Sequence, residues 1–115
     1  MTPSTLPDLD LFRIRRFCGA RVPERARHQV RLEIEVAGST VTIVEFRAPW
    51  SRELGPEWSK TEIARLQYSP THRHWALFAP NPRRGWRHYA GIGPTPTVEA
   101  LLGEIGSDTT GAFWG

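Results

Sequence analysis

The amino-acid sequence predicts an α+β fold, in which an antiparallel meander sheet of four to five strands has an N-terminal and a C-terminal helix packed on it. Apolar residues recur at helical spacing over residues 11–22 and again over residues 98–105. Between these segments, residues 30–36 alternate between apolar and charged, which is typical of a strand with one buried face. Helices at both ends of a run of strands pack most simply on one face of the sheet.

The first helix is expected from about Leu9 to Ala20. Asp8 stands where it can cap this helix, and arginines gather in the later turns, the order of charges that a helix dipole favours. Pro23 prevents the helix from continuing much further. The residues before the helix, 1–7, are expected to form a flexible N-terminal segment.

The clearest strand follows His28 and contains the alternating residues Val30–Val36. Gly38 and Ser39 supply a two-residue turn suited to a type II′ hairpin. The segment Thr40–Arg47 should therefore return as an antiparallel second strand.

This register predicts an anomaly at Glu45. It falls on the apolar face of the hairpin, opposite Leu32, whereas Val44 and Phe46 fall on the other face. Three explanations are open. A β-bulge near Val44 turns Phe46 inward, or the second face of the sheet is covered, or Glu45 is a partly buried carboxylate beside Arg47. We favour the bulge or the covered face.

Three further strands are expected in the second half of the chain. A connection containing Trp and Pro, Ala48–Ser59, leads to a third strand over residues 62–68. Turn residues then separate it from a fourth strand over residues 74–79. Residues 86–89 are predicted to form a short fifth strand at an edge of the sheet.

A last helix is predicted from the apolar residues at i, i+3, i+4 and i+7 that begin with Val98. Thr95 or Thr97 should cap this helix, and Gly106 should end it. The final residues, 111–115, are too apolar for a frayed end, so we expect them to dock on this chain or on a second subunit.

Length and composition suggest one domain over residues 1–115. A single cysteine cannot form an intramolecular disulfide, and no apolar run is long enough to cross a bilayer. We therefore expect a cytoplasmic protein that does not bind membranes. Fourteen of the fifteen basic side chains are arginines, which suits anion recognition, but we interpret the excess mainly as the coding bias of a GC-rich genome.

The distribution of charge points to a candidate binding surface. Residues 82–90 hold three arginines and no acid, whereas residues 94–115 hold three acids and no base. Cations next to aromatic rings are suited to contacting phosphates and stacking on bases. The alternative is an edge strand protected by its charge. The candidate surface comprises Arg83, Arg84, Trp86, Arg87, His88 and Tyr89.

A candidate pocket is the second possibility. The chain has five tryptophans, and those outside regular elements either pin loops onto the sheet or line a groove. The candidate pocket comprises Glu45, Arg47, Trp50, Trp58 and Arg65. A small enzyme or ligand-binding protein would use this pocket, but the sequence leaves catalysis undecided and we favour a non-catalytic role.

Side chains outside this pocket that could bind a metal ion or act as a nucleophile are less favoured as functional residues. Glu33 and Glu35 point away from Glu45 in a regular hairpin, so they cannot share a metal ion. Cys18 lies on an apolar stripe, which favours a buried structural thiol. A zinc site would need three histidines, His72, His74 and His88, but no nearby acid supports them. We therefore expect no catalytic residue, metal or cofactor.

The predicted function is a non-catalytic binding or interaction module. Its partner would be nucleic acid or another protein. A homodimer formed across the edge strand or through the tail at Phe113 and Trp114 stays open as an alternative.

Short motifs spread over nearly the whole chain are specific in combination. They are Arg21–Arg25, His28–Arg31, Thr42–Glu45, Pro49-Trp50, Gly55–Trp58, Ile63–Leu66, Trp75–Phe78 and Phe113–Gly115. Together they resemble a family of small bacterial proteins, mainly actinobacterial, that is catalogued as a domain of unknown function, number 3024. The resemblance implies a stand-alone bacterial protein and no catalytic residues.

Overall fold

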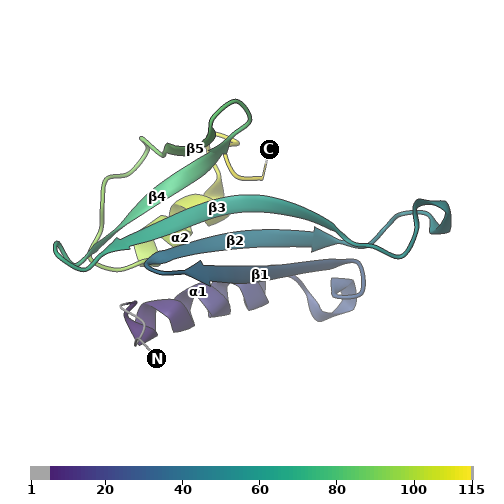
Figure 1. Ribbon diagram of the computed structural model, residues 1–115. Helices are drawn as coiled ribbons and strands as arrows, with labels where there is room; N and C mark the ends of the chain where they lie inside the picture. Colours follow the sequence, from purple (N-terminus) through teal and green to yellow (C-terminus); the bar gives the residue numbers. More distant parts are fainter. Residues whose placement is uncertain (1–5, 115) are drawn as a thin grey trace.

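A five-stranded antiparallel sheet with one helix from each end of the chain forms the structure, a computed structural model that describes residues 6–114 (Figure 1). The strands follow the chain in the order β1-β2-β3-β4-β5. This confirms the predicted α+β meander. The elements are α1 (Asp8–Arg21), η1 (Glu24–Ala26), β1 (Val30–Ala37), β2 (Thr40–Arg47), η2 (Arg52–Leu54), β3 (Ser59–Ser69), β4 (His74–Asn81), β5 (Gly85–His88) and α2 (Glu99–Ser107).

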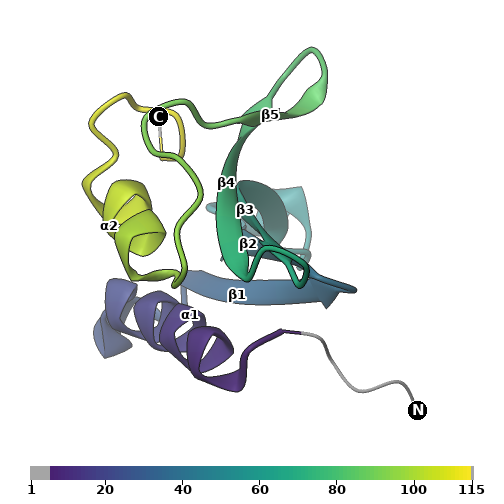
Figure 2. The ribbon, with the colours of Figure 1, turned by 90° about the vertical axis from the view of Figure 1, so that its left-hand side faces the viewer.

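Both helices lie on the same side of the sheet, and no helix among the described residues covers its opposite side (Figures 1 and 2). We call these the helix-covered face and the open face. The core fills the space between the sheet and the helices, where apolar side chains from both layers are excluded from water. Its fully buried residues include Ile14 of α1, Ile43 of β2, Leu77 of β4 and Ile105 of α2.

The hairpin of β1 and β2 has the predicted register. Val36 pairs with Val41, and Leu32 pairs with Glu45, without interruption. Gly38 has a φ of +59°, the left-handed value that the first turn position of a type II′ hairpin requires and that glycine adopts without steric cost.

The anomaly at Glu45 is resolved in favour of a partly buried carboxylate. Glu45 stays on the helix-covered face, with its side chain 15% exposed and Oε1 2.8 Å from Nε of Arg47. A bulge does lie next to Val44, but on the partner strand β3, where Ile63 has no partner in β2. Phe46 is therefore not turned inward. Instead the bulge places both Ile63 and its neighbour Ala64 in the core.

The predicted N-caps of the helices are wrong. Helix α1 already includes Asp8 and begins after Pro7, with no side chain capping it. Thr95 and Thr97 do not cap α2 either. The backbone of Thr95 forms an antiparallel bridge with Trp75, which commits it to the sheet, and its hydroxyl donates a hydrogen bond to the carbonyl of Thr97.

An aspartate from the other helix stabilises the start of α2. Asp10 of α1 is only 4% exposed, and its Oδ1 accepts a hydrogen bond from the backbone N–H of Val98, 3.4 Å away. Its Oδ2 accepts a hydrogen bond of 2.9 Å from the indole N–H of Trp75 in β4. Arg13 pairs with Asp10 at 3.2 Å and with Glu99 of α2 at 3.0 Å. One buried carboxylate therefore connects both helices and the sheet.

The C-terminal tail docks on its own chain. Helix α2 continues one residue beyond Gly106, and Asp108 then takes the left-handed conformation, with a φ of +44°. Its carboxylate accepts hydrogen bonds from the backbone N–H groups of Phe113 and Trp114, at 3.1 and 2.8 Å. The Trp114 indole donates a hydrogen bond to the carbonyl of Ile105, and the Arg21 guanidinium lies 4.2 Å from the centre of its ring.

The segment predicted to be flexible, residues 1–7, is only partly described. Residues 1–5 lie outside the described residues. Leu6 is 4% exposed and belongs to the core, so the structure departs from the prediction at this residue.

Replacing Asp108 tests how the tail is held. Asp108→Ala should lower the free energy of unfolding by about 1–3 kcal/mol, because two backbone N–H groups lose their acceptor. Asp108→Asn should cost less, since asparagine tolerates the left-handed conformation and keeps one acceptor oxygen. Urea unfolding of the two variants measures the difference. Equal stability of both variants and the unsubstituted protein would show that this carboxylate does not hold the tail.

Candidate functional site

Aromatic and cationic side chains meet on the open face where β3, β4 and β5 lie together. Trp86 and His88 of β5 stand on this face, because they pair with Pro80 and Phe78 of β4 and thus alternate with the core residue Ala79. The rings of Phe78 and His88 meet edge to face, with their centres 5.4 Å apart.

Arg65 of β3 completes this cluster. Its guanidinium lies 4.3 Å from the centre of the Trp86 ring, and its Nε–H donates a hydrogen bond of 3.3 Å to the hydroxyl of Thr42. A carboxylate oxygen of Glu62 lies 3.9 Å away. A cation stacked on an aromatic ring gains from the ring quadrupole, so the side chains of Arg65 and Trp86 hold each other in place.

We define the β4–β5 patch as these open-face side chains together with the two arginines of the adjoining turn. Arg83 and Arg84 are exposed in this turn, where the N–H of Arg83 donates a hydrogen bond to Oδ1 of Asn81. The patch thus combines two aromatic rings, an imidazole and three guanidinium groups. Its members are Arg65, Phe78, Arg83, Arg84, Trp86 and His88.

Strand alternation divides the predicted binding surface between the two faces of the sheet. Arg87 pairs with Ala79 and therefore stands on the opposite side from Trp86. Tyr89 is 6% exposed and packs against Phe113, with their ring centres 5.0 Å apart. Of the six predicted residues, the structure brings four together in the patch.

Sequence reasoning missed Arg65 and Phe78 as members of this cluster. In the predicted meander, β3 runs antiparallel to β4, and Arg65 does pair with Phe78. Extending the pairing rule from the first hairpin to the third and fourth strands could have placed both residues on the face of Trp86.

The charge of the open face changes from one edge to the other. Glu33 and Glu35 lie on the β1 side, where Nζ of Lys60 is 2.7 Å from a carboxylate oxygen of Glu35. Arg31 lies near them, with its guanidinium 4.6 Å from the centre of the Trp58 ring. The acidic side chains of this face are therefore most numerous near β1, whereas Arg83 and Arg84, which have no acidic partner at hydrogen-bonding distance, lie at the β4–β5 end.

The candidate pocket is only partly assembled. Glu45 fixes Arg47 by the 2.8 Å contact, and this hydrogen bond and the negative charge of Glu45 raise the pKa of the Arg47 guanidinium above its ordinary value. Arg47 and Trp50 line an open depression of about 530 Å³, and Trp50 is 88% exposed. This depression could receive a small anion beside an aromatic ring.

The other two residues of the candidate pocket lie elsewhere. Arg65 stacks on Trp86, and Trp58 stacks on Arg31, on the open face of the sheet. Glu45 lies on the helix-covered face, because its partner Leu32 packs against the core. The sheet therefore separates these residues, and they do not form one pocket.

The structure offers no support for the histidine site. The rings of His72 and His74 stack 5.2 Å apart, but His88 lies opposite Phe78, four residues further along β4. Within residues 6–114, no three His, Cys, Asp or Glu side chains gather as a metal ion would require. Glu33 and Glu45 lie on opposite faces of the hairpin, as the register predicted.

Comparison with known proteins identifies the family. The sequence matches the family described as a domain of unknown function, DUF3024, over residues 1–115. The chain belongs to the DUF3024 family. No curated protein and no solved structure matches it.

The helices of this DUF3024 protein are short. None of the helices in the described part of the chain is long and apolar enough to span a membrane.

Cys18 is 4% exposed, and desolvation by burial raises the pKa of its thiol to about 11. The thiol is therefore protonated at neutral pH and is a poor nucleophile.

Burial of Cys18 should make stability depend on alkaline pH. The thiol loses its proton near pH 9 in the unfolded chain and near pH 11 in the folded one, so the unfolded state binds fewer protons between these values. This thiol should therefore lower the free energy of unfolding by about 1 kcal/mol between pH 8 and 10. Urea unfolding at both pH values should show a smaller decline for Cys18→Ala. An equal decline would show that Cys18 titrates normally.

Proposed function

We propose that this protein is a non-catalytic binding module, and that its β4–β5 patch binds single-stranded nucleic acid. The observation that carries the proposal is the Arg65–Trp86 stack on a sheet face that no described helix covers. Exposed bases stack on aromatic rings and guanidinium planes, and every base offers such a surface.

The dimensions of the patch suit a few nucleotides. Strands lie about 4.8 Å apart, so the three strands β3, β4 and β5 span about 10 Å. Bases stacked at about 3.4 Å would place two or three nucleotides across this distance. Trp86 and Phe78 supply the stacking surfaces, and Arg83 and Arg84 lie at one end, where phosphates would pass.

Charge favours a short single strand over a duplex. The net charge is only +3, and Glu33, Glu35 and Glu62 lie on the same face. A duplex would present a line of phosphates to this whole face and would meet these carboxylates. A single strand confined to the β4–β5 patch avoids most of them.

Two other functions have less support. A partner protein could use the same open face, because Trp and Arg are common at the centres of protein interfaces. A small enzyme or ligand-binding protein with a pocket around Glu45 and Arg47 is the alternative that the sequence suggested. It is less favoured, because the sheet separates Arg65 and Trp58 from that pair.

The setting that we propose is the cytoplasm of a bacterium, mainly in actinobacteria. The excess of arginine over lysine supports a GC-rich genome, and the single cysteine is compatible with a reducing compartment.

Trp86 is the residue with which to test binding. Trp86→Ala should weaken binding of a fluorescein-labelled single-stranded RNA of twelve nucleotides, and of the DNA of the same sequence, by about tenfold or more. The physical reason is the loss of both a stacking surface and the support for Arg65. Fluorescence anisotropy at several salt concentrations measures the affinity, which should fall as salt rises.

Trp50→Ala is the matched control, since it removes an equally large ring from an exposed site outside the patch. It should leave the affinity within about twofold. Absence of binding to either strand at low salt would refute the proposal. Equal losses in the two variants would show that binding is not specific to the patch and would contradict the role proposed for Trp86.

A further inference from the structure

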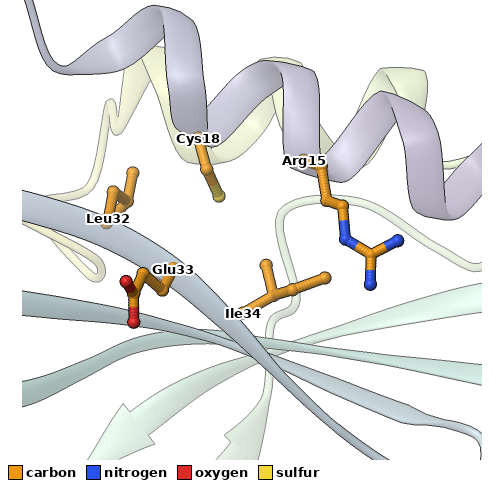
Figure 3. Close-up of a pocket in the computed structure, with 5 residues that line it drawn as sticks. All are labelled: Arg15, Cys18, Leu32, Glu33 and Ile34. Carbon is orange, nitrogen blue, oxygen red and sulfur yellow. The ribbon is translucent and has the colours of Figure 1, made fainter.

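A groove runs between helix α1 and the outer edge of β1. It consists of two adjoining depressions of about 300 and 180 Å³, which share Cys18, Leu32 and Glu33 in their linings. Figure 3 shows one of them, with Cys18 of α1 and Leu32 and Ile34 of β1 facing the space between the two elements. The groove therefore has a helix for one wall and a sheet edge for the other.

The sheet edge offers backbone hydrogen-bonding groups to this groove. Ala37 and Thr40 flank the two-residue turn and pair with each other. Residues that flank such a turn form a hydrogen-bonded pair, and hydrogen-bonded pairs recur at every second residue. The backbone groups of Ala37, and of every second residue before it, are therefore hydrogen-bonded to β2. The N–H and C=O groups of Val30, Leu32 and Ile34 consequently point outward. No strand among the described residues pairs with this edge.

The same residues also supply the apolar side of the groove. Along an edge strand, the backbone groups of successive residues point alternately toward the neighbouring strand and away from it. The side chains of successive residues also alternate, between the two faces of the sheet. Residues whose backbone groups point outward therefore all have their side chains on one face. The half-buried side chains of Leu32 and Ile34 thus stand on the helix-covered face, next to buried Cys18. Glu33 points the other way in Figure 3.

Arginines lie at the two ends of the groove. Arg15 lines the depression near Ile34, and Arg27 lines the one near Val30. Both side chains are exposed and make no ion pair with a carboxylate of the described residues. The groove thus has the apolar side chains of Leu32 and Ile34 and the thiol of Cys18 in its middle, Glu33 at its β1 rim and an arginine at each end.

We propose that this groove binds an extended peptide segment of a partner protein, which adds to β1 as a sixth strand. Its backbone would pair with the outward groups of β1, as in other cases of strand addition. Every second side chain would be apolar and enter the groove, and acidic side chains at the two ends would meet Arg15 and Arg27.

Other occupants fit less well. A helix could not use the backbone groups of the edge, which suit an extended chain. A second copy of this protein that paired through its own β1 would have to bring its α1, which contacts that strand, close to the first copy's α1. An extended peptide has no such helix.

The test uses a seven-residue peptide with glutamate at positions one and seven, valine at positions three and five and threonine at positions two, four and six, so that the glutamates and valines share one face of the strand. We expect it to bind, and we expect a peptide with lysine at both ends to bind at least tenfold more weakly. Fluorescence anisotropy of fluorescein-labelled peptides measures both affinities. Equal affinity of the two peptides, or no binding of either, would overturn the proposal.

Exchanging one arginine tests the position of the site. Arg15→Glu should weaken binding of the glutamate peptide by about tenfold, because it places like charges together. Arg16→Glu is the matched control, since Arg16 is exposed on the same helix but does not line the groove. Equal effects of the two variants would mean that only the overall charge matters.

Methylation of the peptide backbone tests strand addition without changing the protein. Only alternate N–H groups of an added strand point to β1: those of the valines in an antiparallel strand, and those of the threonines in a parallel one. N-methylation of one set should abolish binding, and N-methylation of the other should leave it nearly unchanged. If both sets have the same effect, the peptide does not bind as a strand.

Discussion

The buried carboxylate of Asp10 is the interaction on which the arrangement of layers depends. It receives the indole N–H of Trp75 and the backbone N–H of Val98, and thereby ties α1 to β4 and to the start of α2. A carboxylate that is almost removed from water requires such partners, because its unpaired charge would cost several kcal/mol. Arg13 supplies a compensating charge at the solvent side. The two helices are therefore fixed on one face of the sheet, which leaves the open face and the edge of β1 accessible for binding.

Much of the fold could be predicted because it depends on local patterns. Alternation from Val30 to Val36 and a two-residue turn determine the register of the first hairpin, and the observed pairing follows it. The cap of α2 could not be predicted in this way. Thr95 and Thr97 satisfy the local rule for an N-cap, but Asp10 takes their place, and its burial depends on contacts with residues 65 and 88 positions away. An aspartate in the first turn of a helix ordinarily indicates only a favourable interaction with the helix dipole.

The candidate site could also be predicted only where it depends on local patterns. The alternation of aromatic and charged residues along β5 suggested one surface, but it combined Trp86 with Arg87 and Tyr89, whose side chains lie on the opposite side of the sheet. Arg65 was assigned to the wrong group, because its position opposite Phe78 depends on the pairing of two later strands. No local sequence pattern predicts the groove beside β1. It arises because α1 packs next to a strand edge, and neither element predicts this alone.

A double-mutant cycle between Asp10 and Trp75 tests the central claim most directly. Asp10→Ala, Trp75→Phe and the double variant would be unfolded in urea, and the coupling energy between the two side chains obtained from the three changes in free energy. If the carboxylate joins the layers through the indole, the coupling should be about 1–3 kcal/mol, and either single variant should weaken the protein. Additive effects, with a coupling near zero, would contradict the role assigned to Asp10.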